Sequence, residues 1–373
     1  MIRHRCKAAG PPRRSAGSTW SSIIATILLI AATGCQAREP TAPPSPSSIA
    51  SSQAAVGHPA PPTPDVTWLM NAIQHVASAN PTFGLHDDAG IPMETLKIDA
   101  YPGGYLGVYH YRLADHYVVR LATSIDLVHW AFRTQLDVDA SQPTLASLSD
   151  GTYLLAVEAD NAGRPGPGRR WLRFRHYAGR DALLSGRADR IFDAPHTLTA
   201  ANRGAEGTPN IYSAVLRPGI GRSRIEVGFH FLEAGVDREA LGTLTNFTSW
   251  VTRRNGSLDA ALIKIGMAGK HGDRDSVMAG STIDTLVESQ NGRDKLWRVA
   301  LFDPRTSMIH PLRIETPAGS TSFANPTVTY APLPSGEPGI VITLYVPRTG
   351  SAVGEVGELL YYRSLPGYPE ATQ

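Results

Sequence analysis

A junction of polar residues followed at once by a short strand recurs four times along the chain. The junctions are Gln142-Pro143, Thr208-Pro209, Arg274-Asp275 and Asn325-Pro326. They lie 66, 66 and 51 residues apart, measured at the second residue of each pair. A second apolar or alternating run follows each junction, over Tyr153–Glu158, Ile225–Phe231, Ile283–Glu288 and Gly339–Tyr345. Such a unit cannot bury its apolar faces alone, so the copies must stack against one another.

A third run often completes the unit, over Trp171–Tyr177, Leu296–Phe302 and Glu358–Tyr362. A fifth, less regular unit opens the domain with Met93–Ile98, Gly104–Tyr111 and Tyr117–Ala122. Five antiparallel units of this kind predict an all-β fold, a five-bladed β-propeller over residues 84–373. The alternative is a β-sandwich with coincidental similarity between its strands. The 35 Gly, 29 Pro and only 18% charged residues favour short strands and many turns.

The first 34 residues have the layout of an export signal. Five basic residues between Arg3 and Arg14 precede the uncharged run Ile23 to Ala32, which is too short to span a bilayer comfortably. The run ends in Ala32-Thr33-Gly34-Cys35, which resembles a bacterial lipobox. We therefore expect residues 1–34 to be a lipoprotein signal peptide and Cys35 to be the lipidation site. An uncleaved membrane anchor is the alternative.

Two segments separate this signal from the repeats. Residues 35–64 are mostly Pro, Ala and Ser, a composition that predicts a disordered tether. Asp65 to Ala79 carries apolar residues at helical spacing, with Asp65 or Thr67 as the N-cap. We expect 65–83 to be a short helix and lead-in that packs on the outside of the domain.

Charge and cysteine content exclude several function classes. The chain has 35 Lys+Arg and 33 Asp+Glu, but five of the basic residues and none of the acidic ones lie in the signal, so the mature net charge is −3. This balance does not favour a nucleic-acid partner. The two cysteines are Cys6 in the signal and Cys35, which leaves none for a disulfide, a zinc site or a nucleophile. We expect a monomer without cofactor or metal, although a structural cation in the central channel stays an open alternative.

Three short motifs resemble five-bladed propeller glycoside hydrolases, the arabinanase/β-xylosidase family and its invertase-like relatives. The run from Ser124 to Trp130 resembles their blade-ending pattern S-x-D-L-x-x-W, and Ser149 to Leu155 resembles their D-G-x-Y-Y-L hairpin. Ala205-Glu206-Gly207-Thr208-Pro209 is similar to their Glu-Gly-Pro acid motif. The resemblance implies a propeller that acts on a glycan, with Glu206 as the acid.

A propeller would bring the polar strand ends together. The first strand of each blade lines the channel and the second returns antiparallel, so the starts of the first strands and the ends of the second strands share one face. First-strand starts supply Glu94, Asp139 with Gln142, Glu206, Asp273 with Arg274 and Asp275, and Asn325. Second-strand ends supply His110, Glu158, His230, Glu288 and Tyr345. We predict a ligand-binding face there, with a solvated or structural role as the alternative for any single residue.

Glycoside hydrolysis needs two carboxyl groups, an acid that protonates the leaving oxygen and a second group that activates water or attacks the sugar. Glu206 is the predicted acid, because Gly204 and Gly207 would allow a substrate to approach it closely. Asp88, Glu94 and Asp139 are the candidates for its partner. The resembling enzymes commonly carry their first catalytic Asp at the entry to blade one, directly before a proline, and Ile91-Pro92-Met93-Glu94 has no such Asp.

Two functions follow as hypotheses. The first is an exported, lipid-anchored glycoside hydrolase-like protein, in which Gln142, Glu158, His230, Asp273, Arg274, Asp275, Glu288 and Asn325 bind the substrate. The second is a non-catalytic propeller that binds a carbohydrate or a protein on the same face. Gln36 after Cys35 resembles the outer-membrane default, so we expect the periplasmic face of the outer membrane or the cell surface.

Overall fold

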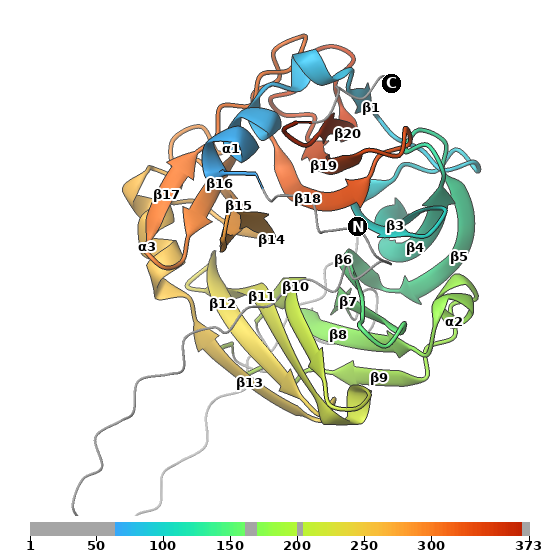
Figure 1. Ribbon diagram of the computed structural model, residues 1–373. Helices are drawn as coiled ribbons and strands as arrows, with labels where there is room; N and C mark the ends of the chain where they lie inside the picture. Colours follow the sequence, from blue (N-terminus) through green and yellow to red (C-terminus); the bar gives the residue numbers. More distant parts are fainter. Residues whose placement is uncertain (1–63, 161–169, 200–203, 368–373) are drawn as a thin grey trace, which may run out of the picture. The chain divides into compact units, whose positions relative to one another are not determined.

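The computed structural model describes residues 64–160, 170–199 and 204–367, and all of them belong to one compact unit. Five four-stranded antiparallel sheets stand around a common axis (Figure 1), so the predicted five-bladed β-propeller is confirmed. The innermost strands of consecutive blades contact one another, and the innermost strand of blade five contacts that of blade one, which closes the ring.

Each blade runs from its innermost to its outermost strand in chain order, except the last. Blade one is β2 (Glu94–Tyr101), β3 (Gly104–Leu113), β4 (His116–Ser124) and β5 (Ala131–Val138). Blade two is β6 (Ala140–Ser147), β7 (Tyr153–Asp160), β8 (Arg170–Tyr177) and β9 (Arg190–Asp193). Blade three is β10 (Glu206–Leu216), β11 (Ser223–Glu233), β12 (Val236–Thr245) and β13 (Ser249–Arg254). Blade four is β14 (His271–Ala279), β15 (Thr282–Gln290), β16 (Trp297–Asp303) and β17 (Met308–Pro311).

Blade five joins the two ends of the domain. It consists of β18 (Ala324–Pro332), β19 (Pro338–Val346), β20 (Gly357–Ser364) and β1 (Thr82–Phe83), which comes from the N-terminal side. Thr82 pairs with Leu360 and Phe83 with Leu359, so the lead-in supplies the outer strand of the last blade. This pairing ties blade five to the chain segment that enters blade one.

The predicted helix before the propeller is α1 (Val66–Gln74), followed by the 3₁₀-helix η1 (Val76–Ala79). Asp65 caps α1 by accepting a hydrogen bond from the backbone N–H of Trp68 at 2.8 Å. Leu69 and Ile73 are buried in one hydrophobic cluster with residues of blades four and five. The remaining helical elements are α2 (Arg180–Leu184), η2 (Ile220–Arg222) and α3 (Gly256–Lys264). Among the described residues, no helix has the length and apolar character needed to span a membrane.

The S-x-D-L-x-x-W motif is a turn that seats a tryptophan. Ser124 Oγ accepts from the backbone N–H of Leu127, and Trp130 Nε1 donates to the Leu127 carbonyl at 3.1 Å. Trp130 is 2% exposed and lies over Gly107, where a Cβ would stand 2.6 Å from the indole. Trp250 lies over Gly242 in blade three in the same way. The motif therefore serves packing within a blade.

Candidate functional site

All five innermost strands begin with the same irregularity at one end of the channel. We call this end the strand-start face: it holds the starts of β2, β6, β10, β14 and β18 and the ends of β3, β7, β11, β15 and β19. The register shifts by one residue between Glu94 and Lys97, Ser141 and Thr144, Gly207 and Asn210, His271 and Arg274, and Ala324 and Thr327. Such bulges redirect side chains and backbone groups at functional or structural junctions.

Four of the bulges contain a polar residue with positive φ. These are Thr95 at 58°, Gln142 at 51°, Thr208 at 48° and Asn325 at 48°. Left-handed backbone is unfavourable for residues other than glycine, so the surrounding structure must hold each of them in place. In blade four the register places Asp273, and not Asp275, level with Pro143, Pro209 and Pro326. The predicted alignment of that blade was therefore wrong by two residues.

Acidic and imidazole side chains at the strand-start face link neighbouring blades. Gln142 N donates to His110 Nδ1 at 3.1 Å, and Thr208 N donates to Glu158 Oε2 at 2.9 Å. Asn325 N donates to Glu288 Oε2, and Thr95 N donates to Glu358 Oε2 at 2.9 Å. In each case the acceptor belongs to the preceding blade, and we call these four contacts interblade latches. All four acceptors are buried.

The latches explain two glycines of the innermost strands. A Cβ at Gly207 would stand 2.0 Å from Glu158 Oε2, and a Cβ at Gly272 would stand 1.8 Å from Glu288 Oε1. Gly207 thus makes room for a latch carboxylate rather than for a substrate. For Glu158 and Glu288, the structural alternative describes the observed contacts better than the ligand-binding prediction does.

Glu206 does not have the surroundings of an exposed acid. Its side chain is 2% exposed, and Oε1 accepts backbone hydrogen bonds from Thr197 at 2.8 Å, Leu198 at 2.7 Å and Thr199 at 3.0 Å. A Cβ at Gly204 would stand 2.2 Å from Thr199, so this glycine also serves the loop that enters β10. The geometry does not support the predicted catalytic role, because an oxygen held by three amide donors fixes a loop.

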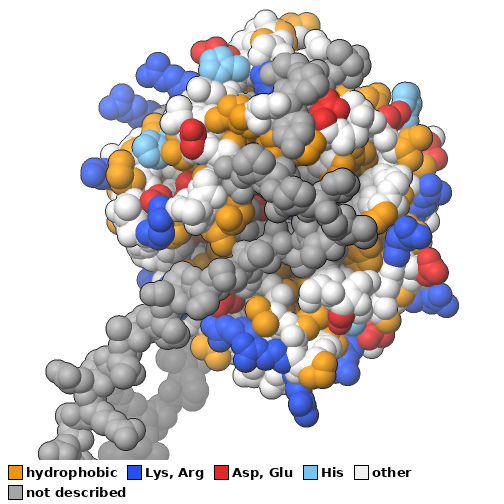
Figure 2. All heavy atoms as spheres, in the orientation of Figure 1, with side chains coloured by type: hydrophobic (Ala, Val, Ile, Leu, Met, Phe, Trp, Pro, Cys, Tyr) orange, Lys and Arg blue, Asp and Glu red, His pale blue; other side chains and the backbone are white. Residues whose placement is uncertain are grey.

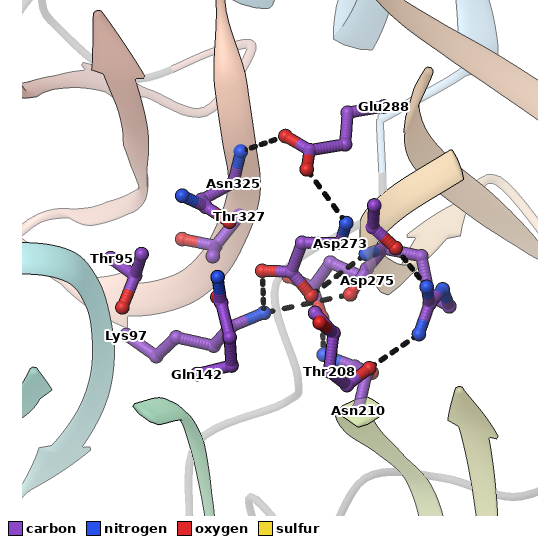
Figure 3. A network of polar contacts seen from close by, with 12 residues as sticks. Thr95, Lys97, Gln142, Thr208, Asn210, Asp273, Asp275, Glu288, Asn325 and Thr327 are labelled. Carbon is purple, nitrogen blue, oxygen red and sulfur yellow. Dashed lines mark hydrogen bonds and ion pairs between the residues drawn. The ribbon is translucent and has the colours of Figure 1, made fainter. Parts of the chain in front are cut away.

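A buried polar network joins residues of the bulges and of the strands that follow them across the channel (Figure 3). Lys97 Nζ lies 2.8 Å from Asp273 Oδ2, which joins blade one to blade four. Asp275 accepts from Asn210 Nδ2 at 3.1 Å and from the backbone N–H of Val328 at 2.9 Å, so it joins blades three, four and five. The Lys97–Asp273 ion pair and these two contacts of Asp275 therefore run between blades and not within one blade.

Arg274 completes this network from inside blade four. The side chain is 0% exposed, its Nε lies 2.9 Å from Glu239 Oε2 in blade three, and it donates to the carbonyl of Thr208. Arg274 and Asp273 are therefore sealed within the domain and do not reach a substrate in this conformation. Across the described residues, no three His, Cys, Asp or Glu side chains group closely enough to hold a metal ion.

Glu94 is a predicted carboxylate of this face that stays accessible. Its side chain is 31% exposed and lies 3.7 Å from His110 Nε2, too far for a hydrogen bond. Burial raises the pKa of Glu94. Burial lowers the pKa of His110 to about 3, so this imidazole is neutral and the contact is not an ion pair at neutral pH.

Half-buried aromatic and charged groups surround Glu94. Tyr117 stacks edge-on against His110 with ring centroids 5.0 Å apart. Burial, followed by the charge of Glu94, raises the pKa of Tyr345 to about 12. Arg170 is 52% exposed and pairs with Glu158 at 3.2 Å and with Asp160 at 3.3 Å. The pKa of His230 is lowered by burial first, then by the charge of Arg274, and then by the charge of Arg170. The groups around Glu94, from blades one, two and five, form the open part of the face.

The other predicted site residues are held by backbone contacts or stay buried. Asp88 accepts a hydrogen bond from the backbone N–H of Phe132 at 2.8 Å, and the carbonyl of Asp139 accepts one from Asp160 N. His230 is 8% exposed, and its Nδ1 has no partner among the described residues. Gln142 Oε1, Asn210 Oδ1 and Asn325 Oδ1 are likewise buried and unpartnered within the described part of the chain.

Sequence reasoning missed Lys97, Glu239 and Glu358, which hold the blades together, and Arg170 and Tyr117, which line the open face. Lys97 carried a usable signal, since a lysine within the innermost strand of a propeller must find a buried partner. Glu358 carried no such signal, because it lies in the third strand of its blade and its partner Thr95 in blade one is more than 260 residues away in the sequence.

No protein-family model and no curated protein matches this chain. Solved structures similar in fold include one described as a glycoside hydrolase, with 11% identity, a TM-score of 0.50 and coverage of 84% of this chain and 94% of that one. A thermostable family-43 glycoside hydrolase has 10% identity, a TM-score of 0.47 and coverage of 79% and 97%. Fructan 1-exohydrolase IIa from Cichorium intybus has 13% identity and a TM-score of 0.45. Its match covers 78% of this chain and 58% of the enzyme. The similarity at a TM-score of 0.50 concerns the fold alone and agrees with the five-bladed propeller predicted from the repeated units.

Proposed function

We propose that the mature domain is an exported, lipid-anchored protein that binds a glycan on the strand-start face without hydrolysing it. One observation carries this proposal: most carboxylates of the strand-start face accept hydrogen bonds from backbone N–H groups. Glu158, Glu288 and Glu358 close the latches and Glu206 fixes a loop. Among the predicted acid and base residues, Glu94 and Asp139 keep a partly exposed carboxylate to which no backbone N–H of the described residues donates.

The position that would carry the first catalytic Asp in the resembling enzymes holds a hydroxyl. Pro143, Pro209 and Pro326 share a register position, and its equivalent in blade one is Leu96. The residue directly before it is Thr95, and the equivalents in blades two, three and five are Gln142, Thr208 and Asn325. Hydroxyl and carboxamide groups exchange hydrogen bonds with sugar hydroxyls but cannot carry out acid–base catalysis near neutral pH.

The open part of the face offers what a sugar ring requires. Glu94 can accept two hydroxyl hydrogen bonds, and Arg170 can donate from a guanidinium that is 52% exposed. Tyr117 and Tyr345 are half-buried and present apolar ring surface together with a phenol. A few fixed polar groups beside aromatic rings are typical of small-ligand sites in proteins.

Hydrolysis is the second candidate, and the state of Glu94 favours it. Burial raises the pKa of this half-exposed carboxyl, as is required of a group that exchanges protons near neutral pH. The reaction needs a second carboxyl across the substrate, for which Asp139 stays the sequence-based prediction.

Binding and turnover measured on one panel separate the two candidates. The panel holds arabinan- and xylan-type oligosaccharides and aryl glycosides, tested with the wild type, Glu94→Gln and the control Glu337→Gln in the β18–β19 turn at the opposite end of the channel. Under the proposal the wild type binds without releasing sugar, and Glu94→Gln weakens binding about tenfold or more, because a hydrogen bond to a charged group contributes about 1.5–3 kcal/mol. Turnover lost in Glu94→Gln would establish the hydrolase, and failure to bind any glycan would overturn both.

The anchor is tested separately. The wild type should stay with membranes in high salt, whereas Cys35→Ser should be released, since an acyl chain holds by apolar burial that salt does not screen.

A further inference from the structure

Arginines gather around a hollow at the other end of the channel. We call this end the strand-end face, because the innermost strands finish there. The hollow has a volume of about 620 Å³ and is lined by Val215, Arg217, Arg222, Ser223, Arg224 and Asn246, from the β10–β11 loop and the β12–β13 turn of blade three. In Figure 2, Lys and Arg side chains are visible along the lower part of the view, where Figure 1 shows blade three, and also at the upper left and the right. Without residues 1–34 the chain has a net charge of −3, so the arginines around the hollow are not simply a sample of a basic chain.

Most of these arginines lack an acidic partner. Arg224 pairs with Glu226 at 2.9 Å, but no carboxylate of the described residues lies within 4.0 Å of the guanidinium of Arg217, Arg222 or Arg190. Arg190 reaches the same loop, because its Nη1 lies 4.0 Å from the point where a Cβ on Gly221 would stand. Like charges held together repel one another, and an anion between them would remove that repulsion.

The backbone fixes the positions from which these side chains reach. Arg217 N donates to the Arg222 carbonyl at 2.9 Å, and Ser223 Oγ donates to the Ile220 carbonyl at 2.7 Å. Asn246 N donates to the Ser223 carbonyl at 2.7 Å, which ties the second turn to the first. The hollow is thus an ordered feature of blade three, and guanidinium groups are the side chains best suited to oxyanions such as phosphate.

The chain enters the domain on the same face. Gly280, in the turn between β14 and β15, donates its N–H to the carbonyl of Pro64 at 2.7 Å. That turn lies at the strand-end face of blade four, next to blade three. A tether attached through Pro64 therefore starts on the same face as the arginine hollow, at the end of the channel opposite Glu94.

We propose that the arginine hollow binds the phosphate of anionic phospholipids in the membrane that holds the tether, and so turns the strand-start face outward. This inference rests on the proposed anchoring. The tether alone keeps the domain near the surface, and the hollow sets which face meets it. Each basic residue near an anionic surface contributes roughly 1 kcal/mol, which corresponds to about a fivefold change in partition.

Vesicle binding of the full chain carrying Cys35→Ser tests the hollow without the lipid. Vesicles of phosphatidylcholine alone are compared with vesicles that also contain phosphatidylglycerol, and the measured quantity is the ratio of the two partition coefficients. Adding Arg217→Gln and Arg222→Gln should lower that ratio roughly 20- to 30-fold. The matched control is Arg293→Gln with Lys295→Gln, which removes the same charge from the β15–β16 loop on the strand-start face and should leave the ratio nearly unchanged. Because every chain compared carries the same N-terminal segment, differences report the hollow.

Three outcomes would overturn the proposal. One is an equal loss in both double variants, which would mean that net charge alone drives binding. Another is the absence of any preference for phosphatidylglycerol. The third is stabilisation of the wild type by inorganic phosphate, at constant ionic strength, without vesicle binding, which would mark a site for a free anion. Failure of the anchor would appear elsewhere, as release of the wild-type chain from membranes by salt.

Discussion

Replacement of Glu206 by alanine separates the loop-fixing role of this residue from a catalytic one. The substitution removes one acceptor from three backbone donors, those of Thr197, Leu198 and Thr199. A buried donor left without a partner costs about 1–3 kcal/mol. Thr197 is exposed and the other two residues are half-buried, so water can reach the freed amides and the lower figure applies. We expect a loss of about 3 kcal/mol in the free energy of unfolding, roughly 5–10 °C in melting temperature.

Thermal and urea unfolding, followed by far-ultraviolet circular dichroism, measure this loss. Glu206→Gln keeps an acceptor oxygen and should lose only about 1 kcal/mol, because a neutral acceptor replaces a charged one. Glu233→Gln is the control, since this carboxylate of the same blade pairs with Arg254 at the surface and should contribute less than about 1 kcal/mol. Unchanged stability in both Glu206 variants, together with loss of a measured glycosidase activity, would refute the loop-fixing role.

Three further predictions concern the contacts between blades. Gly207→Ala would place a Cβ 2.0 Å from Glu158 Oε2, so we expect the latch to open at a cost of about 1–3 kcal/mol, measured by urea unfolding. Lys97→Met leaves Asp273 buried without its cation and should cost about 3–5 kcal/mol, whereas adding Asp273→Asn should restore much of that loss in a double-mutant cycle. His110 has a folded-state pKa lowered to about 3, so between that value and about 6.5 only the unfolded chain binds this proton, and its contribution to stability falls by about 1.4 kcal/mol per pH unit on acidification. The pH slope should be shallower by that amount in His110→Gln, and equal slopes in the two proteins would contradict a buried neutral imidazole.

The fold could be predicted because its signal is repeated. Second strands expected over Tyr153–Glu158 and Gly339–Tyr345 are present as β7 (Tyr153–Asp160) and β19 (Pro338–Val346). The closure of the ring could not be predicted, because β1 is only two residues long and gives no periodic pattern. Its position follows from the open edge of blade five, which becomes visible only when the sheets are assembled.

The site could be predicted as a place but not as a set of contacts. Sequence spacing placed Glu94, His110 and Glu158 at one face, and the structure has them there. Spacing could not tell which side chains face the solvent and which face the next blade, since both kinds stand at strand ends. That distinction depends on the bulges, which move the chain by one residue and leave no mark in the sequence other than Pro143, Pro209 and Pro326.

One junction shows why acidic strand ends need not indicate catalysis. Four bulges present an N–H to the preceding blade, and each meets a carboxylate or an imidazole. Between blades three and four the bulge holds Gly272, which is not in the left-handed region, and His230 Nδ1 has no partner in the described structure.

Arg274 closes this junction instead, by donating to the Thr208 carbonyl while its Nε lies against Glu239. The bulge geometry therefore accounts for the acceptor at each of the four latches. At the exception, a side chain of the bulged strand β14 makes the contact in place of its backbone N–H. A ring of carboxylates and imidazoles is what these interblade contacts require, whatever the protein binds. Function at this face must accordingly be sought in the groups that make no latch, with Glu94 first among them.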